Sequence, residues 1–598
     1  MKSNKQFTIN NLATQWAEKI NKRSPLCEYP RPQMIRDNWQ SLNGIWDYAV
    51  TKKQTSCPEN MDGIIVVPYA IESNLSSVCR KFTPDEKLHY KRQFTVNNIK
   101  PGSRVLLHFE AVDWKCEVFV NNNQVGTHTG GYIPFSIDIT DSILIGDNNL
   151  IVSVTDPTDS NWQQRGKQVL EPTTIWYTAT SGIWQTVWLE IVPENHIESL
   201  KTTPNLTESS VQIIAFTDYS SNVNIKILNE NKTITEINGK TNIANTISIP
   251  SPHLWSPDDP FLYQLEITTE TDSVKSYFGM RSISLKMDKT GRNMMLLNET
   301  SIFLNGPLDQ GYWPESGMTP PCDEAMVFDL QSMKNLGFNM IRKHIKVESR
   351  RWYYHADRLG LLVVQDMPNG GKGIVDHVGA LVKTIFGNAP KDDNPTSYHF
   401  ADRSSIVSRQ NFESELDEMI IHLRNHPSIV IWCPFNESWG QFDSWRIYKH
   451  VKSIDPTRLV DHVSGWHDQG CGDFLSVHTY KSKLTAPSAN DRRAYFITEY
   501  GGYNYIDKDH LWRDDDEYGY KYFSTAKKLN RAYESLITDQ VIPLIDKGLC
   551  GVIYTQLSDV EIETNGIFTY DRKVLKFDSE KTKALNNEIQ ERFKIVNT

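Results

Sequence analysis

The stretch SIVIWCPFNESWG, residues 428 to 440, joins a short apolar run directly to polar residues. The run from Ile429 to Trp432 has the length and the β-branched content of a buried strand. Asn436 and Glu437 follow it closely, although amide and carboxylate groups resist burial unless they are paired. Polar residues at the end of a buried strand are typical of a parallel α/β barrel, where functional side chains lie at the carboxyl ends of the strands.

The sequence around this stretch alternates between helical and strand patterns. Upstream of Pro427, apolar residues recur at helical spacing, at Phe412, Leu416, Met419, Ile420 and Leu423. Earlier still, a helix from Met326 to Leu336 is stopped by Gly337 and leads to the strand FNMIR, and a second helix ends at Leu359-Gly360 before the strand LLVVQ. This alternation predicts a (β/α)8 barrel over residues 289–598.

The amino-terminal half carries only strand patterns. Three segments indicate a β-sandwich over residues 1–195: RVLLHFEAV, NLIVSVTD, and CEVFVNNNQVG with Asn122-Asn123 as its turn. The segments VQIIAF, VNIKIL and FLYQLEI follow, and the region 196–288 has the length of one immunoglobulin-like β-sandwich. The sequence therefore predicts a multidomain chain with two β-sandwiches followed by a barrel.

Composition excludes several classes of function. The 598 residues carry a formal net charge of -10 without a basic stripe, so we expect no nucleic-acid partner. No apolar run approaches the roughly 20 residues of a membrane span, and the first 20 residues lack the apolar core of a signal peptide, so we expect no membrane association and a cytoplasmic location. The eight cysteines include no C-x-x-C pair, which favours free buried thiols over disulfides or zinc ligands.

Polar residues at the ends of the predicted barrel strands form one candidate site: Arg342, His344, Asn436, Glu437, His478, Tyr480, Glu499 and Gln556. Glu437 and Glu499 come from different strands. Paired carboxylates are what glycoside hydrolysis needs, one to protonate the leaving oxygen and the other to attack the anomeric carbon or activate water. A single strand-end glutamate is more often a surface ion-pair partner, so the prediction depends on the whole set.

Four segments carry a family resemblance. RNHPSIVIWCPFNE and FITEYGG resemble the acid/base and nucleophile segments of glycoside hydrolase family 2, the family of β-galactosidases, β-glucuronidases and β-mannosidases. SGIWQTVWLE is similar to that family's sugar-binding-like sandwich, and SYFGMRSI to the end of its immunoglobulin-like module. The resemblance covers nearly the whole chain. It implies a jelly-roll sandwich, an immunoglobulin-like sandwich and a catalytic TIM barrel, in that order.

The resemblance also implies roles for the candidate residues. Glu437 is expected to be the general acid/base and Glu499 the nucleophile of a retaining enzyme. Supporting roles are expected for Asn436 as a ligand of the 2-hydroxyl, Tyr480 as a donor to Glu499, Arg342 as an orienter of the nucleophile, and His344 and His478 as ligands of sugar hydroxyls. On the residues alone, Arg342 is equally a structural charge partner, and a lone histidine is more often structural.

The chain departs from the family pattern at several positions. DMPNGG, residues 366 to 371, stands where metal-dependent β-galactosidases have Ile-Glu-Thr-His-Gly, so we expect no metal and no cofactor, with magnesium in doubt. ETNGIFTYDR, residues 563 to 572, lacks the Asn-x-Lys that grips a uronic acid, Phe435 stands where β-mannosidases carry a second asparagine, and YTQ replaces a tryptophan on the last strand. Asp309 and Trp313, after the first barrel strand, are predicted to shape the sugar subsite instead.

These observations predict a retaining exo-β-glycosidase, with β-galactosidase-like activity as the first interpretation. The alternatives are a β-glycosidase for another pyranose, such as a β-glucuronide, β-galacturonide, β-mannoside or arabinopyranoside, and a carbohydrate-binding protein without catalysis. The last would be marked by a missing carboxylate, and both are present. The expected partner is a small oligosaccharide or glycoconjugate substrate, and the oligomeric state stays open, a homo-oligomer included.

Overall fold

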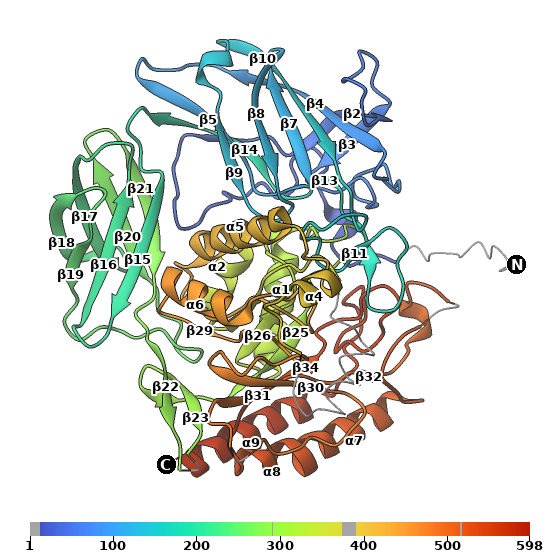
Figure 1. Cartoon of the computed structure of the whole chain (residues 1–598). Helices are drawn as coiled ribbons and strands as arrows, with labels where there is room; N and C mark the ends of the chain where they lie inside the picture. Colours follow the sequence, from blue (N-terminus) through green and yellow to red (C-terminus); the bar gives the residue numbers. More distant parts are fainter. Residues whose placement is uncertain (1–11, 290, 373–389, 489, 515–516, 598) are drawn as a thin grey trace, which may run out of the picture.

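The computed structural model describes residues 12–289, 291–372, 390–488, 490–514 and 517–597. It contains an amino-terminal β-sandwich, an immunoglobulin-like module and a carboxy-terminal parallel barrel, with the two sandwiches packed against the barrel (Figure 1), which confirms the predicted fold class. Residues 1–11, part of the stretch on which the signal-peptide expectation rests, lie outside the described residues. Within the described ranges, no helix is both long and apolar enough to cross a bilayer.

The amino-terminal sandwich has two main sheets, in the strand orders β1-β14-β5-β9 and β3-β2-β4-β10-β7-β8. Their strands are β1 (Trp39–Ser41), β2 (Gly44–Lys52), β3 (Gly63–Val67), β4 (Glu86–Val96), β5 (Ser103–Phe109), β7 (Lys115–Val120), β8 (Asn123–Thr129), β9 (Phe135–Asp138), β10 (Gly146–Thr155) and β14 (Val187–Pro193). Leu150, Val152 and Val154 alternate along β10 and are fully buried, which agrees with the strand predicted for NLIVSVTD. The β7–β8 turn lies at Asn121-Asn122, one residue earlier than predicted. Both asparagines adopt positive φ, which this residue type tolerates in a tight hairpin.

The immunoglobulin-like module also pairs two sheets, with the strand orders β15-β16-β19 and β18-β17-β20-β21. Its strands are β15 (Ser199–Asn205), β16 (Ser210–Phe216), β17 (Asn222–Asn229), β18 (Lys232–Lys240), β19 (Asn245–Ser248), β20 (Tyr263–Thr269) and β21 (Ser273–Phe278). A hairpin of β22 (Ile283–Met287) and β23 (Asn293–Leu297) then leads to the barrel, and the predicted limit after residue 288 falls in its turn.

The barrel sheet has eight strands in the order β29-β28-β27-β26-β25-β34-β31-β30, and every neighbouring pair is parallel. The strands are β25 (Leu304–Asp309), β26 (Met340–Lys343), β27 (Leu362–Asp366), β28 (Ile429–Cys433), β29 (Leu459–Val460), β30 (Phe474–Thr479), β31 (Ala494–Gly501) and β34 (Leu549–Thr555). The barrel is nearly closed, with β29 and β30 at the two ends of the sheet order.

Helices cover the barrel on its outside, as Figure 1 shows. They include α1 (Asp323–Asn335), α2 (Arg350–Leu359), α4 (Pro395–Phe400), α5 (Ile406–Leu423), α6 (Ser444–Ile454), α7 (Ala526–Leu536), α8 (Ile542–Ile545) and α9 (Ser579–Asn597). The predicted end of α2 is confirmed. Gly360 adopts φ +72, and its N–H donates to the carbonyl of Ala356. A Cβ at this position would also lie 2.5 Å from the carbonyl oxygen of Pro257, so glycine is required there for two reasons.

The strand boundaries differ from the predicted ones at the site. Glu499 lies within β31 rather than after it, and β26 continues one residue past Arg342, because backbone pairing with the neighbouring strands continues there. His478 lies within β30, as predicted. The eight cysteines are free, as predicted, but only Cys116, Cys433, Cys471 and Cys550 are buried.

Candidate active site

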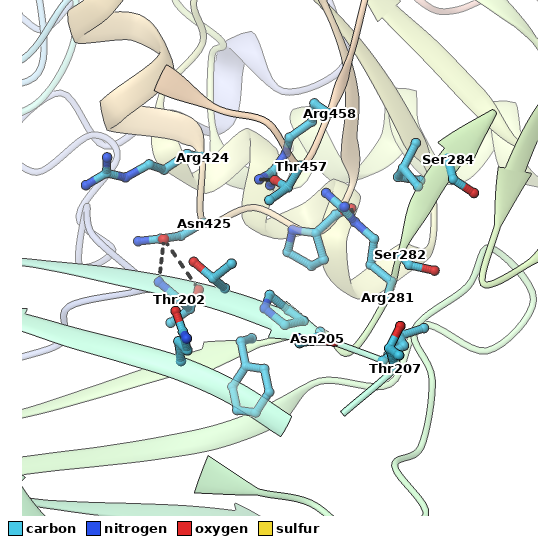
Figure 2. A pocket seen from close by; sticks show the side chains of 18 of the residues that line it. Thr202, Asn205, Thr207, Arg281, Ser282, Ser284, Arg424, Asn425, Thr457 and Arg458 are labelled. Atoms are coloured by element: carbon cyan, nitrogen blue, oxygen red, sulfur yellow. Dashed lines mark hydrogen bonds between the residues drawn. The ribbon is translucent and has the colours of Figure 1, made fainter. Parts of the chain in front are cut away.

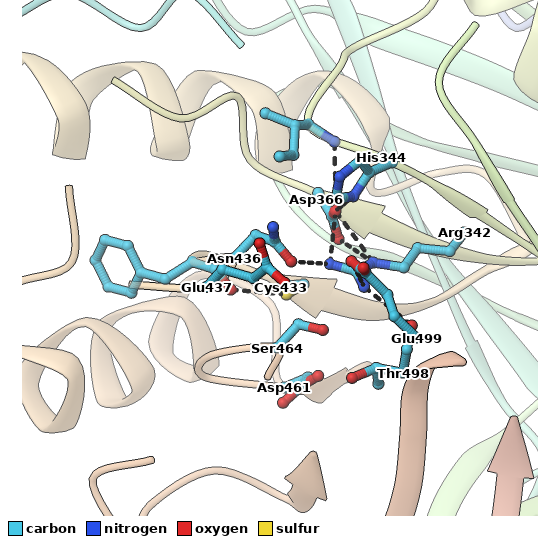
Figure 3. Close-up of polar contacts among 12 residues, drawn as sticks. Arg342, His344, Asp366, Cys433, Asn436, Glu437, Asp461, Ser464, Thr498 and Glu499 are labelled. Atoms are coloured by element: carbon cyan, nitrogen blue, oxygen red, sulfur yellow. Dashed lines mark hydrogen bonds and ion pairs between the residues drawn. The ribbon is translucent and has the colours of Figure 1, made fainter. Parts of the chain in front are cut away.

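Glu437 and Glu499 face each other at the carboxyl end of the barrel (Figure 3). Glu437 follows β28, whereas Glu499 lies on β31. One carboxylate oxygen of each residue and one ring nitrogen of His478 all lie within 4.8 Å of one another. Retaining glycosidases hold their carboxyl groups about 5 to 5.5 Å apart, whereas inverting enzymes need roughly 6.5 to 9.5 Å to admit a water molecule. The arrangement of the two carboxylates therefore matches the retaining geometry.

The loop after β28 turns sharply at Glu437. Glu437 and Ser438 adopt φ +48 and +66, a region that residues other than glycine seldom occupy. The N–H of Glu437 donates to the carbonyl of Ser464 at 2.9 Å, and the N–H of Trp439 donates to that of Asn436 at the same distance. These two hydrogen bonds hold the strained backbone that aims the Glu437 carboxylate into the mouth.

Charged neighbours set the protonation of Glu437. Burial by itself raises its pKa, but the hydrogen bond and charge of His478, followed by the charges of Lys167 and Arg342, outweigh burial. The pKa of Glu437 is therefore below its usual value. Nδ1 of His478 lies 2.7 Å from Oε1 of Glu437, and the Ser464 hydroxyl lies 2.8 Å from Nε2.

Arg342 links the residues around Glu499. Its guanidinium is fully buried and donates to Oε1 of Glu499 at 3.2 Å, to Oδ1 of Asn436 at 2.8 Å and to both carboxylate oxygens of Asp366 at 3.1 Å. Because Oδ1 of Asn436 accepts from Arg342, its Nδ2 remains as the donor toward a ligand. These contacts place Arg342 beside Glu499, and its role as an orienter of the nucleophile stays a prediction.

Asp366, at the end of β27, is a residue that the sequence interpretation missed as part of the site. Its carboxylate accepts from Arg342 and lies 2.8 Å from Nδ1 of His344. Burial, followed by the charges of Lys167 and Arg342, holds the pKa of His344 well below its usual value, so the ring is neutral. With its Nδ1–H bonded to Asp366, Nε2 of His344 is an acceptor for a hydroxyl. In the sequence, Asp366 directly follows the apolar strand LLVVQ, and this position at a strand end predicts a site residue.

Tyr480 holds the second oxygen of Glu499. Its hydroxyl donates to Oε2 of Glu499, and its ring stacks on Tyr520 with centroids 3.7 Å apart. Burial and the charge of Glu499 raise the pKa of Tyr480 well above its usual value, which keeps the phenol protonated. The expected contact between Tyr480 and Glu499 is therefore present in the structure.

Gln556 follows β34 and belongs to a buried amide network. Its Nε2 donates to Oδ1 of Asn565 at 2.9 Å, and Nδ2 of Asn565 donates to Oε1 of Glu563 at the same distance. Oε1 of Gln556 is buried and has no hydrogen-bond partner in the described part of the chain, which leaves it as an acceptor for a ligand. Glu563 is a further carboxylate near the site that the sequence interpretation missed.

Asp309 and Trp313, two predicted site residues, have their recorded side-chain contacts with residues other than Glu437 and Glu499. Asp309 accepts from Nζ of Lys343 at 2.6 Å and from the N–H of Gly311 at 2.8 Å, so both of its carboxylate oxygens are engaged. Trp313 is buried, and the guanidinium of Arg572 lies 4.1 Å from its ring centroid. The role of these residues in a sugar subsite stays a prediction.

The amino-terminal sandwich contributes a loop to the mouth, which the sequence interpretation also missed. The N–H groups of Arg165 and Gly166 both donate to the carbonyl of Asn369 in the barrel, each at 2.9 Å. Trp176 from the same loop contacts Trp439 edge-on, with centroids 4.6 Å apart. Residues so far from the barrel in sequence give no local signal of this contact.

A metal ion has one candidate position among the described residues, the group Glu437, His478 and Glu499. A carboxylate pair and an imidazole are reasonable ligands for a divalent cation. However, these are the same atoms that the paired-carboxylate chemistry requires, and each is already hydrogen bonded within the protein. The group therefore fits acid/base and nucleophilic roles better than metal binding.

A separate cavity of about 410 Å³ lies between the immunoglobulin-like module and the barrel (Figure 2). Arg281 and Arg458 line it, and both donate to the carbonyl of Ile429. Oδ1 of Asn425 accepts from the N–H of Thr202 at 3.0 Å across the same boundary. These contacts join the two domains, and none of the predicted site residues lines the cavity.

Three family models match the chain in succession. The sugar binding domain of glycosyl hydrolases family 2 matches residues 39–193, a second family 2 model matches residues 195–281, and the TIM barrel domain of the family matches residues 289–518. Their order along the chain is the order of sandwich, immunoglobulin-like module and barrel in the structure.

Curated relatives are similar over part of their length. A β-galactosidase of Thermoanaerobacter pseudethanolicus is 26% identical over 448 residues, which are 70% of this chain and 54% of that protein. A putative β-glucuronidase of Formosa agariphila is 27% identical over 370 residues, which are 58% of this chain and 40% of that protein. The chain thus spans about half the length of the relatives it matches.

Solved structures share the fold over nearly the whole chain. A β-glucuronidase from an uncultured Clostridium species has a TM-score of 0.72 at 18% identity, covering 94% of this chain and 99% of that one. A β-galacturonidase from Eisenbergiella tayi bound to galacturonate has a TM-score of 0.67 at 18% identity, with the same coverage. Together with the three consecutive family matches, these findings confirm the resemblance seen in the sequence: the chain belongs to glycoside hydrolase family 2.

Proposed function

We propose that this protein is a retaining exo-β-glycosidase that removes a terminal, non-reducing, β-linked sugar. The observation that carries the proposal is the close approach of the two carboxylates, with oxygens of Glu437 and Glu499 within 4.8 Å of each other. That spacing is shorter than the roughly 6.5 to 9.5 Å at which inverting enzymes admit a nucleophilic water beside the sugar, so the second carboxylate is suited to attack the sugar itself.

In the first step, Oε1 or Oε2 of Glu499 attacks the anomeric carbon while Glu437 gives its proton to the leaving oxygen. Arg342 and Tyr480 donate to the two oxygens of Glu499. They hold the carboxylate in line with the anomeric carbon. The bond to the aglycone breaks, and a glycosyl-enzyme forms with inverted configuration.

In the second step, Glu437 is a carboxylate and takes a proton from water, which attacks the anomeric carbon from the face that the aglycone left. Configuration inverts again, so the overall outcome is retention. Nδ2 of Asn436 is placed to donate to the 2-hydroxyl, since its Oδ1 accepts from Arg342. This hydrogen bond strengthens as the ring flattens toward an oxocarbenium ion, which lowers the barrier of both steps.

The identity of the sugar has two candidates. The curated relatives include β-galactosidases, which favours a neutral hexose, whereas the solved structures of similar fold include β-glucuronidases and β-galacturonidases, which favours a uronic acid. A panel of p-nitrophenyl β-glycosides tests the proposal. We expect hydrolysis of at least one β-pyranoside and no hydrolysis of its α-anomer, with Glu437→Gln and Glu499→Gln as folded controls that lose turnover. A panel without any hydrolysed member would contradict the proposed function.

A further inference from the structure

The loop of the amino-terminal sandwich that reaches the barrel places one lysine at the mouth. Tyr177 donates its N–H to the carbonyl of Lys167 at 2.9 Å, and the short strands β11 (Gln168–Val169) and β12 (Tyr177–Thr178) pair directly after it. The backbone of Gly166, the preceding residue, is bonded to Asn369 of the barrel. The backbone on both sides of Lys167 is therefore hydrogen bonded, which fixes the position of its Cα and Cβ.

The ammonium of Lys167 lies beside the Tyr177 ring, and its charge influences Glu437 and Glu563. Its Nζ lies 5.9 Å from the centroid of the Tyr177 ring, and the Tyr177 hydroxyl donates to Glu563. Burial is the largest influence on the pKa values of Glu437, Glu563 and His344, and the positive charge of Lys167 lowers all three. The ammonium thus lies within electrostatic range of the acid/base, the histidine acceptor and the buried carboxylate at once.

The same ammonium lacks a strong acceptor. Across the described ranges it makes no hydrogen bond and no ion pair, although an ammonium has three donors to satisfy. By contrast, Arg342, the other cation of the site, is saturated by Asp366, Glu499 and Asn436. A partly buried cation with free donors at the edge of a ligand site is suited to bind an anionic group of that ligand.

We propose that Lys167 is the specificity-determining residue that binds the carboxylate of a terminal uronic acid, which makes the substrate a β-linked uronide. The inference rests on the proposed glycosidase function. Without a cation, the carboxylates of Glu437, Glu499 and Glu563 would repel an anionic sugar. Asn565 and Glu563, in the barrel stretch that lacks the family's Asn-x-Lys, supply no positive charge. Lys167 supplies it from a different domain.

Glu563 supports a competing interpretation, in which Lys167 binds a hydroxyl of a neutral sugar. Its carboxylate accepts hydrogen bonds from Tyr177 and Asn565. The charge of Lys167 lowers the pKa of Glu563, although the two groups form no ion pair. A hydroxyl of a neutral sugar that lies between the two groups would accept from Lys167 and donate to Glu563. The two interpretations differ in the charge of the group that Lys167 binds, so matched charged and neutral substrates separate them.

The experiment compares p-nitrophenyl β-D-glucuronide and β-D-galacturonide with the corresponding β-D-glucoside and β-D-galactoside. Each substrate is tested on the full chain, on Lys167→Met, on Lys167→Arg, and on Lys115→Met, a control at an exposed position of strand β7 in the same domain. We expect the wild-type protein to prefer a uronide to its neutral counterpart. We expect Lys167→Met to lower kcat/KM for the uronide on the order of 10²-fold, because a charged partner is lost. Lys167→Arg should restore part of the loss, and Lys115→Met should change neither substrate.

Two results would overturn the inference while leaving the proposed glycosidase intact. One is a wild-type preference for the neutral sugar. The other is an equal loss of uronide and neutral activity in Lys167→Met, which would show that Lys167 acts through Glu437 or through the loop. Thermal unfolding of each variant, compared with the wild type, reports whether the loop contact survives. A wild-type protein that hydrolyses none of the four substrates would instead count against the glycosidase proposal, which the α- and β-pyranoside panel then tests separately.

Discussion

Nδ1 of His478 lies 2.7 Å from Oε1 of Glu437, within the mouth of the barrel. The contact joins a residue of β30 to the loop that follows β28, and it stabilises the ionised carboxylate. A general acid must be protonated to act, so this hydrogen bond determines the pH range in which the first chemical step proceeds.

The lowered pKa of Glu437 predicts a pH profile. As pH rises through that pKa, Glu437 loses the proton that it gives to the leaving oxygen. We therefore expect kcat/KM to fall as pH rises, and the fall to begin at a lower pH than an ordinary glutamate would give. His478→Phe removes the donor and the charge, and burial then raises the pKa of Glu437. The alkaline limb should therefore move to higher pH, measured as kcat/KM with an unactivated substrate. His253→Phe, an exposed histidine paired with Asp259 in the immunoglobulin-like module, should leave the limb in place. If the pH at which kcat/KM falls is the same in His478→Phe as in the wild type, His478 does not lower the pKa of Glu437.

Azide rescue separates the roles of the two carboxylates. In Glu499→Ala, azide can attack an activated aryl β-glycoside directly from the face opposite the leaving group, and we expect the α-glycosyl azide. In Glu437→Ala the glycosyl-enzyme still forms from an activated substrate, and azide needs no general base, so we expect the β-glycosyl azide. The configuration of the product is measured by NMR.

Reversed products would exchange the roles of Glu437 and Glu499. Wild-type activity in both variants would show that the site lies elsewhere. Neither outcome depends on how much activity each variant loses, which matters because loss of activity alone does not distinguish an acid/base from a nucleophile.

Because the guanidinium of Arg342 is buried and hydrogen bonded, we expect its replacement to lower both stability and turnover. Lys cannot reproduce the planar set of donors to Asp366, Glu499 and Asn436. We expect Arg342→Lys to lower the free energy of unfolding by about 1–3 kcal/mol. We also expect kcat to fall on the order of 10²-fold, because the nucleophile is displaced. Arg446→Lys is the control, since its ion pair with Glu413 is half exposed and should contribute less than about 1 kcal/mol. Unchanged kcat in Arg342→Lys would remove Arg342 from the catalytic arrangement.

Chelation tests the metal question. The candidate ligands are the catalytic atoms themselves, so a bound ion would compete with the proposed chemistry rather than support it. We expect turnover to stay nearly the same after treatment with EDTA and removal of the chelator by gel filtration. A large loss that magnesium restores would show that ligands come from positions not recognised here.

Local sequence patterns were sufficient for the parts of the fold that depend on local physics. The alternation along β10, the helix stop at Gly360 and the apolar run of β28 follow from side-chain period and backbone preference, and the structure agrees with each. The turn at Asn121-Asn122 was misplaced by one residue, because three consecutive asparagines offer the same local preference at more than one position.

The candidate site was predictable to the extent that it lies at strand ends. Because the carboxyl ends of parallel strands converge, a carboxylate after β28 and another on β31 must approach one another, and Glu437 and Glu499 do. The same argument applies to Asp366, which ends β27.

Local periodicity and short motifs in the sequence are sufficient to predict the order of the three domains, the family and the two carboxylates. The tertiary fold is what brings Lys167, on a sandwich loop, close enough to Glu437, Glu563 and His344 for its charge to lower their pKa values. It likewise sets the contacts of Asp309 with Lys343 and Gly311. The physical reason is that electrostatic interactions depend on distance in space, whereas a sequence pattern records only distance along the chain.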